Sequence, residues 1–375
     1  MISQNVRLGL IADRDTQSAA LLEKLLRLAP RRLSEQYVNG EFVFTVTGQA
    51  APEGGWRLRP VGTSIRYSAI AALGLLHVAE PEQRAVLGGQ TCDGLAGQLV
   101  KRLDEITGAG DAALICWVAA ETAHGDLPHA VARLRHLDRQ QGTLDVVSAA
   151  WVVSALVAAR HLVDVEQHLA EARQRLLAAR GAIAYPHTTS GAAPWYRAHV
   201  GSFADQVYPI QALARLHGSA DDPEALAVAG AVARVIIAAQ GESGQWWWHY
   251  DSRTGAVVEG YPVYTVHQHA MAPMALLDLA DAGGEDHLDA VCRGLRWLAD
   301  PPESHEALVV EEPPITWRKI ARGDHRKVVR GARAFATALR PGVRLRPLDW
   351  VFRPGVIDRE CRPYELGWLL MTWLS

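Results

Sequence analysis

Six segments of this chain predict helices that are apolar on nearly every side, and this feature limits the possible folds most strongly. Each opens with a residue that commonly starts a helix and then becomes almost continuously apolar. A helix without a polar face must lie inside the protein. The chain therefore has to enclose six helices, which begin near Gly62, Gly108, Gly142, Gly201, Tyr264 and Cys361.

Amphipathic, charged segments alternate with these six. We expect them to form an outer layer of helices at residues 88–103, 127–137, 163–179, 222–239 and 286–299. The economical packing is an all-α (α/α)6 toroid, in which an inner ring of six helices is surrounded by an outer ring. A closed ring has no open end that would need a polar cap. The alternative, an open helical array, has two such ends.

Two segments fall outside this alternation. Residues 41–49 and 55–61 alternate with period two and predict a β-hairpin, so residues 1–60 are expected to hold an N-terminal helix and hairpin, and residues 61–375 the toroid. Residues 301–362 form a basic, proline-interrupted insert with an extra helix near 327–339. Its arginines either cover a solvated outer helix or hold an anionic ligand such as phosphate, diphosphate or uronate.

The composition excludes several kinds of protein. A net charge of -3 gives no basic surface for nucleic acid, and no apolar run is long enough for a membrane span. The four cysteines include no C-x-x-C pair, which argues against structural zinc and fits a reducing compartment. Phosphate-loop, dinucleotide, serine-hydrolase and zinc-protease motifs do not occur. We expect a cytoplasmic protein without a cofactor, and the sequence leaves the oligomeric state open.

If the inner helices run in the same direction, their N-termini open on one face of the ring. The polar residues near those starts are Arg66, Tyr67, Asp111, Asp145, Asp205, Tyr208, His267, His269, Tyr364 and Glu365. An aspartate near a helix start also caps the helix, and Asp111 and Asp145 fit that role best. For catalysis we favour Asp205 or Glu365 as acid or base, with His267 or His269 as partner. Two histidines two apart on a helix do not share a face, so no metal site is predicted there.

The stretch GESGQWWWHYDSRTG directly precedes an inner helix and would overhang this face. Adjacent tryptophans cannot all point one way, and we expect Trp247 and Trp248 to stack on a substrate ring. Residues 246–262, WWWHYDSRTGAVVEGYP, form a strip that alternates enough to predict a hairpin with SRTG as its turn. Further substrate contacts are expected from this strip and from the long loop at residues 186–202, namely from His249, Tyr250, Asp251, Tyr264, Trp195 and Arg197.

The helical alternation, together with GQWWWHYD and HQHAMAPMALLDL, resembles two toroid superfamilies. One is the six-hairpin glycosidase-like group, which includes sugar 2-epimerases, glucuronyl C5-epimerases and unsaturated-glucuronyl hydrolases. The other is the squalene-cyclase and prenyltransferase toroid, which AAQGESGQWWW resembles in its Gln, Gly and Trp between helices. The D-x-D-D acid of class II cyclases does not occur in this chain.

The first resemblance implies an enzyme that acts on a glycan or sugar derivative, of epimerase, lyase or hydrolase type. Its substrate would be a small molecule or an oligosaccharide bound at one end of the ring. The second resemblance implies a terpene cyclase or another enzyme that uses a prenyl diphosphate, with the basic insert holding the diphosphate. A glycan-binding protein without catalytic activity is the third possibility.

Overall fold

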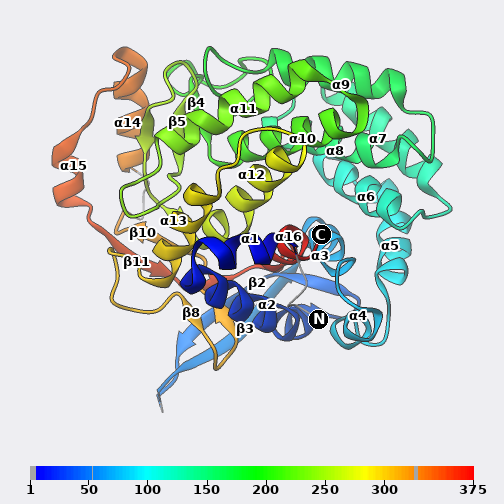
Figure 1. The fold of residues 1–375 in the computed structure, drawn as a ribbon, viewed down its shortest axis with the longest axis horizontal. Coiled ribbons are helices and arrows are strands. Elements are labelled where there is room, and N and C mark those ends of the chain that lie inside the picture. Colours follow the sequence, from blue (N-terminus) through cyan, green and yellow to red (C-terminus); the bar gives the residue numbers. More distant parts are fainter. Residues whose placement is uncertain (1–5, 53, 325–327) are drawn as a thin grey trace.

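The computed structural model describes residues 6–52, 54–324 and 328–375, and within them the helices form a closed double ring (Figure 1). Each inner helix packs against the next, and α16 packs against α3, so the ring closes. The predicted (α/α)6 toroid is confirmed, and the open array is excluded. The inner ring consists of α3 (Ile65–Leu75), α6 (Ala109–Glu121), α8 (Val146–Ala159), α10 (Ala204–Ala220), the π-helical turn η3 (His267–Met271) with α12 (Ala272–Asp281), and α16 (Pro363–Leu374).

The outer ring follows the predicted charged segments. Its members are α5 (Cys92–Lys101), α7 (Leu127–Gln141), α9 (Glu166–Ala178), α11 (Pro223–Ala238), α13 (Leu288–Ala299) and, from the N-terminus, α2 (Thr16–Gln36). Helix α2 packs against α13 and α16, where it occupies the outer position beside the last inner helix. The division of the chain near residue 60 stays a prediction. Shorter helices are α1 (Val6–Arg14), α4 (Glu80–Val86) and the 3-10 turn η2 (Leu103–Glu105).

The ring closes where the backbones of α3 and α16 touch. A Cβ added to Gly367 would lie 2.5 Å from the carbonyl oxygen of Ile70, and one added to Gly74 would collide with the carbonyl oxygen of Gly367. Only glycine at both positions permits this approach. The last inner helix can therefore lie directly against the first.

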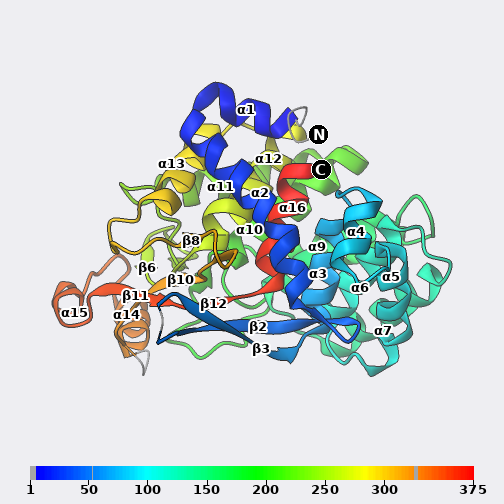
Figure 2. The same ribbon diagram turned by 90° about the horizontal axis from the view of Figure 1, so that it is seen from below.

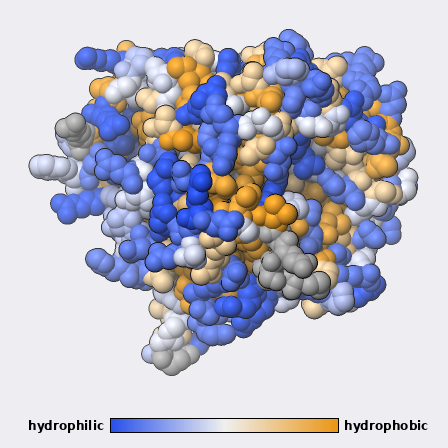
Figure 3. Space-filling model, in the orientation of Figure 1, coloured by the Kyte–Doolittle hydropathy of each residue, from blue (hydrophilic) through white to orange (hydrophobic). Residues whose placement is uncertain are grey.

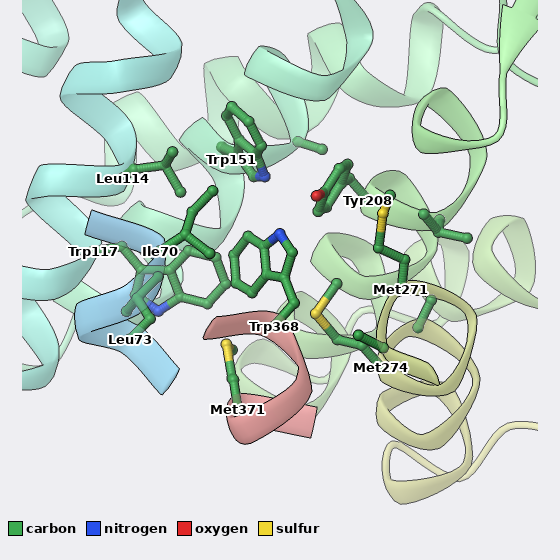
Figure 4. Close-up of a cluster of buried hydrophobic side chains, with 14 of the residues drawn as sticks. Ile70, Leu73, Leu114, Trp117, Trp151, Tyr208, Met271, Met274, Trp368 and Met371 are labelled. Carbon is green, nitrogen blue, oxygen red and sulfur yellow. The ribbon is translucent and has the colours of Figure 1, made fainter. Parts of the chain in front are cut away.

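Aromatic and sulfur-containing side chains fill the centre of the ring (Figure 4). Trp368 lies 6.1 Å from Trp117 and 5.9 Å from Tyr208, and Tyr208 lies 5.2 Å from Trp151, between ring centroids. All four are buried, and burial of each large side chain contributes about 1.5–3 kcal/mol. The ring therefore has a packed core, and its polar groups lie at its ends.

The predicted N-terminal hairpin is confirmed. Strands β2 (Glu41–Ala50) and β3 (Trp56–Thr63) are antiparallel, with Thr47 opposite Arg59. The same sheet contains β1 (Tyr37–Val38) and β12 (Glu360–Cys361). In Figure 2, α16 runs from β12, on the side of this sheet, to the C-terminus on the opposite side. The N-terminal end of α16 therefore lies on the same side as the hairpin.

Two further small sheets lie beside the ring. The predicted second hairpin is confirmed as β5 (His249–Asp251) and β6 (Val257–Glu259), which pair with β4 (Val200–Ser202). Strand β7 (Val263–Tyr264) pairs with β10 (Lys319–Arg322), which pairs with β11 (Pro354–Asp358). The insert therefore pairs, through β10, with the strand that directly precedes η3. A separate short pair is β8 (Val309–Val310) with β9 (Ile315–Thr316).

The insert also carries two helices, α14 (Val328–Leu339) and α15 (Arg346–Val351), which lie at the edge of the molecule in Figure 1. The extra helix expected near 327–339 is thus confirmed from residue 328, while residue 327 lies outside the described residues. Figure 3 shows the face that carries α1 and the end of α16, where apolar residues at the middle are surrounded by hydrophilic ones. No helix in the described ranges is both long and apolar enough to cross a membrane.

Candidate active site

The starts of the inner helices meet on one face of the ring, which we call the mouth. Arg66 at the start of α3 donates from Nε to Oδ1 of Asp111 in α6, and its guanidinium carbon lies 5.4 Å from the ring centroid of Trp151 in α8. Tyr67 lies 4.8 Å from Tyr364 of α16 between ring centroids. Four inner helices therefore bring their first turns together, as a common direction requires.

Asp145 caps its helix. Its Oδ1 accepts the Ser148 N–H at 2.8 Å, and its Oδ2 accepts the Ser148 hydroxyl at 2.7 Å. Asp111 pairs with Arg66 and does not cap α6, whose N-cap is Gly108. Of the two aspartates expected to cap, only Asp145 does so.

The buried Asp205 pairs with the exposed His187, and we call the two the Asp205–His187 pair. Asp205 accepts the Ser202 N–H at 2.6 Å and the Ser202 hydroxyl at 2.8 Å, and its Oδ2 lies 3.2 Å from His187 Nδ1. Burial raises the pKa of Asp205, while the hydrogen bond to Asp205 raises the pKa of His187. The His187 side chain is 60% exposed and Asp205 is fully buried, so the imidazole is open to solvent beside the first turn of α10 and the carboxylate orients it.

Sequence reasoning missed His187. It lies at the start of the loop at residues 186–202, from which only Trp195 and Arg197 were expected to contact the substrate. Only the fold places His187 beside the first turn of α10. His199 of the same loop is buried, with Nε2 at 2.9 Å from the Thr337 hydroxyl. Trp195 packs edge-on against Phe335 of α14 at 5.5 Å and is 63% exposed. Trp195 therefore lies at the protein surface, where the loop at residues 186–202 contacts helix α14 of the insert.

Glu365 is the second buried carboxyl at the mouth. Its Oε2 accepts the Arg362 N–H at 3.3 Å, and its Oε1 lies 3.5 Å from Arg318 Nε. Burial raises the pKa of Glu365 to about 7, although Arg318 and Arg362 oppose this shift. A carboxyl with a pKa near neutrality can both give and take a proton at physiological pH, which is the property of a general acid–base group.

A cavity of about 530 Å³, which we call the mouth cavity, is connected to this carboxyl through Arg318, which lines the cavity and pairs with Glu365. Trp248 and Tyr264 supply its aromatic surface, with ring centroids 4.8 Å apart. The guanidinium carbon of Arg318 lies 5.0 Å from the Tyr264 centroid, and that of Arg330 lies 5.7 Å from the Trp248 centroid. The cavity is also lined by the cations of Lys319, Arg322 and Arg359, by Tyr261, and by the carboxylates of Glu259, Asp324 and Asp358. Five cations, three aromatic rings and three carboxylates therefore share one space.

Arg330 differs from the neighbouring cations of the mouth cavity in its surroundings. Burial lowers its pKa, and Arg197 acts in the same direction. Among the described residues it takes part in no ion pair, whereas Arg318 and Lys319 are each paired with a carboxylate. An unpaired, partly buried guanidinium favours a carboxylate, sulfate or phosphate from a ligand. The basic insert was singled out from the sequence, but Arg318 and Arg330 were not selected individually.

The three consecutive tryptophans face three different surroundings. Trp246 is fully buried, 5.6 Å from Phe203 between centroids. Trp248 lines the mouth cavity and is parallel to the His267 ring, at 6.0 Å and 9°. Trp247 lines a separate cavity together with Tyr261. The structure therefore does not bring Trp247 and Trp248 to the same ligand position.

The histidines of η3 are uncharged at neutral pH, because burial lowers the pKa of both His267 and His269 to about 3. His267 packs behind the cavity wall, 4.4 Å from Phe203 and 4.9 Å from Tyr264 between centroids. His269 lies in the core, where its carbonyl accepts the Trp373 indole N–H at 2.7 Å. Only His267 adjoins the mouth.

The hairpin residues beyond Trp248 are mostly internal. His249 is buried, and burial, together with Arg330 and Arg197, lowers its pKa far below the usual value. Tyr250 is fully buried, and Asp251 pairs with Arg253 Nη2 at 2.7 Å. Among the described residues, no cluster of three or more metal-ligating side chains is placed to hold an ion.

Comparisons with known proteins bear on the fold. No family model matches the chain, and no curated protein matches it in sequence. Solved structures do match over nearly the whole length. A glycosyl hydrolase family 88 protein from Bacteroides vulgatus superposes with a TM-score of 0.56 and 13% identity, over 95% of this chain and 98% of its own.

Two further structures are similar. A variant unsaturated glucuronyl hydrolase from Streptococcus agalactiae, complexed with dGlcA-GalNAc6S, has a TM-score of 0.55 at 11% identity, over 96% of this chain and 91% of its own. A sugar epimerase from a ruminal bacterium has a TM-score of 0.53 at 10% identity, over 88% of this chain and 100% of its own. At such low identity these likenesses establish the architecture: the chain has the six-hairpin toroid fold of these carbohydrate-processing proteins.

Proposed function

We propose that this protein is an enzyme that transfers protons on an acidic glycan or sugar derivative bound at the mouth of the ring. One observation carries the proposal: the buried Glu365 carboxyl pairs with Arg318, and Arg318 also lines a cavity with Trp248 and Tyr264. The similar structures support it, since they include an unsaturated glucuronyl hydrolase bound to a uronyl disaccharide and a sugar epimerase.

Recognition would combine stacking and charge. The flat faces of Trp248 and Tyr264 suit the apolar face of a pyranose ring. Arg330 would pair with the carboxylate of a uronate, because its guanidinium lies over Trp248 and has no carboxylate partner among the described residues. A ring stacked on Trp248 would thus place its acidic group against Arg330.

Two groups at the mouth would move protons. Glu365, with a pKa of about 7, would hold a proton below neutrality and donate it to a sugar oxygen or carbon. The imidazole of His187, oriented by Asp205, would take a proton from water or from the sugar. Hydrolysis, elimination and epimerisation all need one group of each kind.

The proposal modifies the roles expected from the sequence. Asp205 would act through His187 as a positioning residue, and Glu365 would act directly. His267 would contribute a neutral ring behind Trp248, while His269 and Tyr250 would serve the core. We place the activity in the cytoplasm, which the four free, buried cysteines support.

The test is a substrate panel read by product formation, with unsaturated uronyl disaccharides, neutral disaccharides and prenyl diphosphates. We expect turnover of a uronyl compound and a loss of about 10²–10⁴-fold in Glu365→Gln, with unchanged circular dichroism. Turnover of prenyl diphosphates alone would replace the proposal with isoprenoid chemistry. Tight uronyl binding without turnover would make the protein a glycan-binding module.

A further inference from the structure

A second cavity, of about 1130 Å³, lies outside the mouth, and we call it the outer cavity. It is bounded by α11, by the β5–β6 hairpin and by the connection between α14 and α15. Trp247 and Tyr261 line it, together with residues of α11 that include the aliphatic Ala231, Val235 and Ala238 and the charged Arg234. None of the functions assigned to the mouth uses this space.

The aromatic side of the outer cavity is held in a fixed position. A Cβ at Gly260 would lie 2.7 Å from the Trp247 ring, and one at Gly241 would lie 2.6 Å from it, so glycines let the indole rest on the backbone. Tyr261 meets Trp247 edge to face at 5.7 Å, and its hydroxyl donates to Glu303 at 2.6 Å. Both rings are therefore pre-positioned, which lowers the entropic cost of binding a ligand.

Arg322 and Arg333, which line the outer cavity, are already paired, whereas Arg330 of the mouth cavity takes part in no ion pair among the described residues. Arg322 Nε lies 3.2 Å from Glu259 Oε1, and Arg322 Nη2 lies 2.7 Å from Asp349 Oδ1. Arg333 makes two similar pairs with the same carboxylates, at 3.3 and 2.7 Å. Paired charges give no net attraction for an anion, but they leave polar edges that can bond hydroxyl groups.

The two cavities also meet. Tyr261 and Arg322 line both of them, so this pair forms a shared boundary between the outer cavity and the mouth cavity. The side chains of the consecutive residues Trp247 and Trp248 point to different cavities: Trp247 lines the outer cavity and Trp248 lines the mouth cavity. A glycan long enough to occupy both cavities would therefore pass over Tyr261 and Arg322.

We propose that the outer cavity is a second saccharide site, which takes the uncharged sugar residues of a glycan through stacking on Trp247. A rigid aromatic face, aliphatic residues of α11 and the paired charges of Arg322 and Arg333 match a neutral pyranose better than an ion. The link to the mouth rests on the proposed function: the acidic end of the same glycan would occupy the mouth cavity. The preferred substrate is then an oligosaccharide and not a free sugar.

The first test measures binding of neutral oligosaccharides, cellohexaose and maltohexaose, by isothermal titration calorimetry on the full-length protein. We expect saturable binding of one of them, weakened at least about tenfold by Trp247→Ala and by Ala238→Phe, which fills the cavity from α11. Ala227→Phe is the matched control, because it makes the same change on the same helix at an exposed position outside the cavity. It should bind like wild type, as should Glu365→Gln.

The second test separates this site from the mouth. With a uronyl substrate that carries neutral residues, Trp247→Ala should raise KM about tenfold with kcat unchanged, while a uronyl disaccharide should show no change. No binding of either hexasaccharide, or equal binding by Ala238→Phe and Ala227→Phe, would overturn the second site. Neutral binding that persists while every uronyl compound is inert would instead overturn the proposed function alone.

Discussion

Arg318 Nε and Glu365 Oε1 lie 3.5 Å apart in a buried ion pair between the insert and the last inner helix. Arg318 is directly before β10, which pairs with β7, while Glu365 is in the first turn of α16. The insert therefore brings a cation to a buried carboxyl at the mouth whose pKa is raised to about 7. The following predictions depend on this arrangement and on the ring that supports it.

The raised pKa of Glu365 predicts a pH-dependent cost to stability. The pKa rises from 4.5 to about 7 on folding, so the folded state is favoured below about pH 4.5, and this contribution is lost as pH rises through about 7. The loss amounts to about 3 kcal/mol. Relative to wild type, Glu365→Gln should gain several degrees in Tm between about pH 5 and pH 8 in thermal melts. A difference in Tm that stays constant across this range would contradict the assignment.

The Asp205–His187 pair should act as a unit. Asp205→Asn and His187→Ala should each lower kcat about 10²–10⁴-fold, and the double variant should lose little more. Because the bond to Asp205 raises the pKa of His187, the imidazole of Asp205→Asn should titrate at lower pH by NMR. The buried Asp138–His168 pair of α7 and α9, at 2.8 Å, supplies the control. Asp138→Asn should lower stability and leave kcat intact, and a similar loss of kcat there would argue against a specific role for His187.

Arg330→Gln should weaken recognition of the acidic group. We expect KM for a uronyl substrate to rise about tenfold, with a smaller dependence of KM on salt, because a charge-assisted contact is lost. Arg84→Gln removes an exposed arginine that pairs with Glu80 at 2.7 Å and lines neither cavity, so it should change neither quantity. Steady-state kinetics at two ionic strengths check this prediction. Equal effects of the two substitutions would mean that Arg330 acts only through general charge.

The glycine contact between α3 and α16 should be essential to ring closure. Gly367→Ala should destabilise the protein by about 3 kcal/mol in urea unfolding, since its Cβ would meet the Ile70 carbonyl and neither backbone can move away. Gly218→Ala, in open space on α10, should instead stabilise by about 0.5–1 kcal/mol. A Gly367→Ala protein as stable as wild type would show that the two helices separate easily.

The architecture could be predicted from the sequence because buried helices consist almost entirely of apolar residues. A helix such as α8, apolar on all sides, has no stable place except inside a ring or bundle. The positions of Asp205 and Glu365 followed from that architecture, since each lies in the first turn of an inner helix. Helix capping by Asp145 is equally local, because the aspartate and Ser148, which donates both hydrogen bonds to it, are three residues apart.

The partners of these carboxylates could not be predicted in the same way. Arg318 precedes Glu365 by almost fifty residues, and His187 lies in an irregular loop, so no short pattern connects either to its partner. Tertiary strand pairing and loop placement decide both contacts. Trp247 and Trp248 directly precede β5, so which of them faces the mouth depends on how the sheet of β4, β5 and β6 places this segment.

The pH dependence of kcat on a uronyl disaccharide, in wild type and in Arg318→Gln, tests the central claim most directly. With Glu365 as proton donor, kcat should fall as pH rises through about 7 in wild type. Loss of the Arg318 cation should raise the pKa of Glu365, so this fall should move upward by about one pH unit. A flat profile, or a midpoint that does not move upward in Arg318→Gln, would contradict the assignment of Glu365 as the acid.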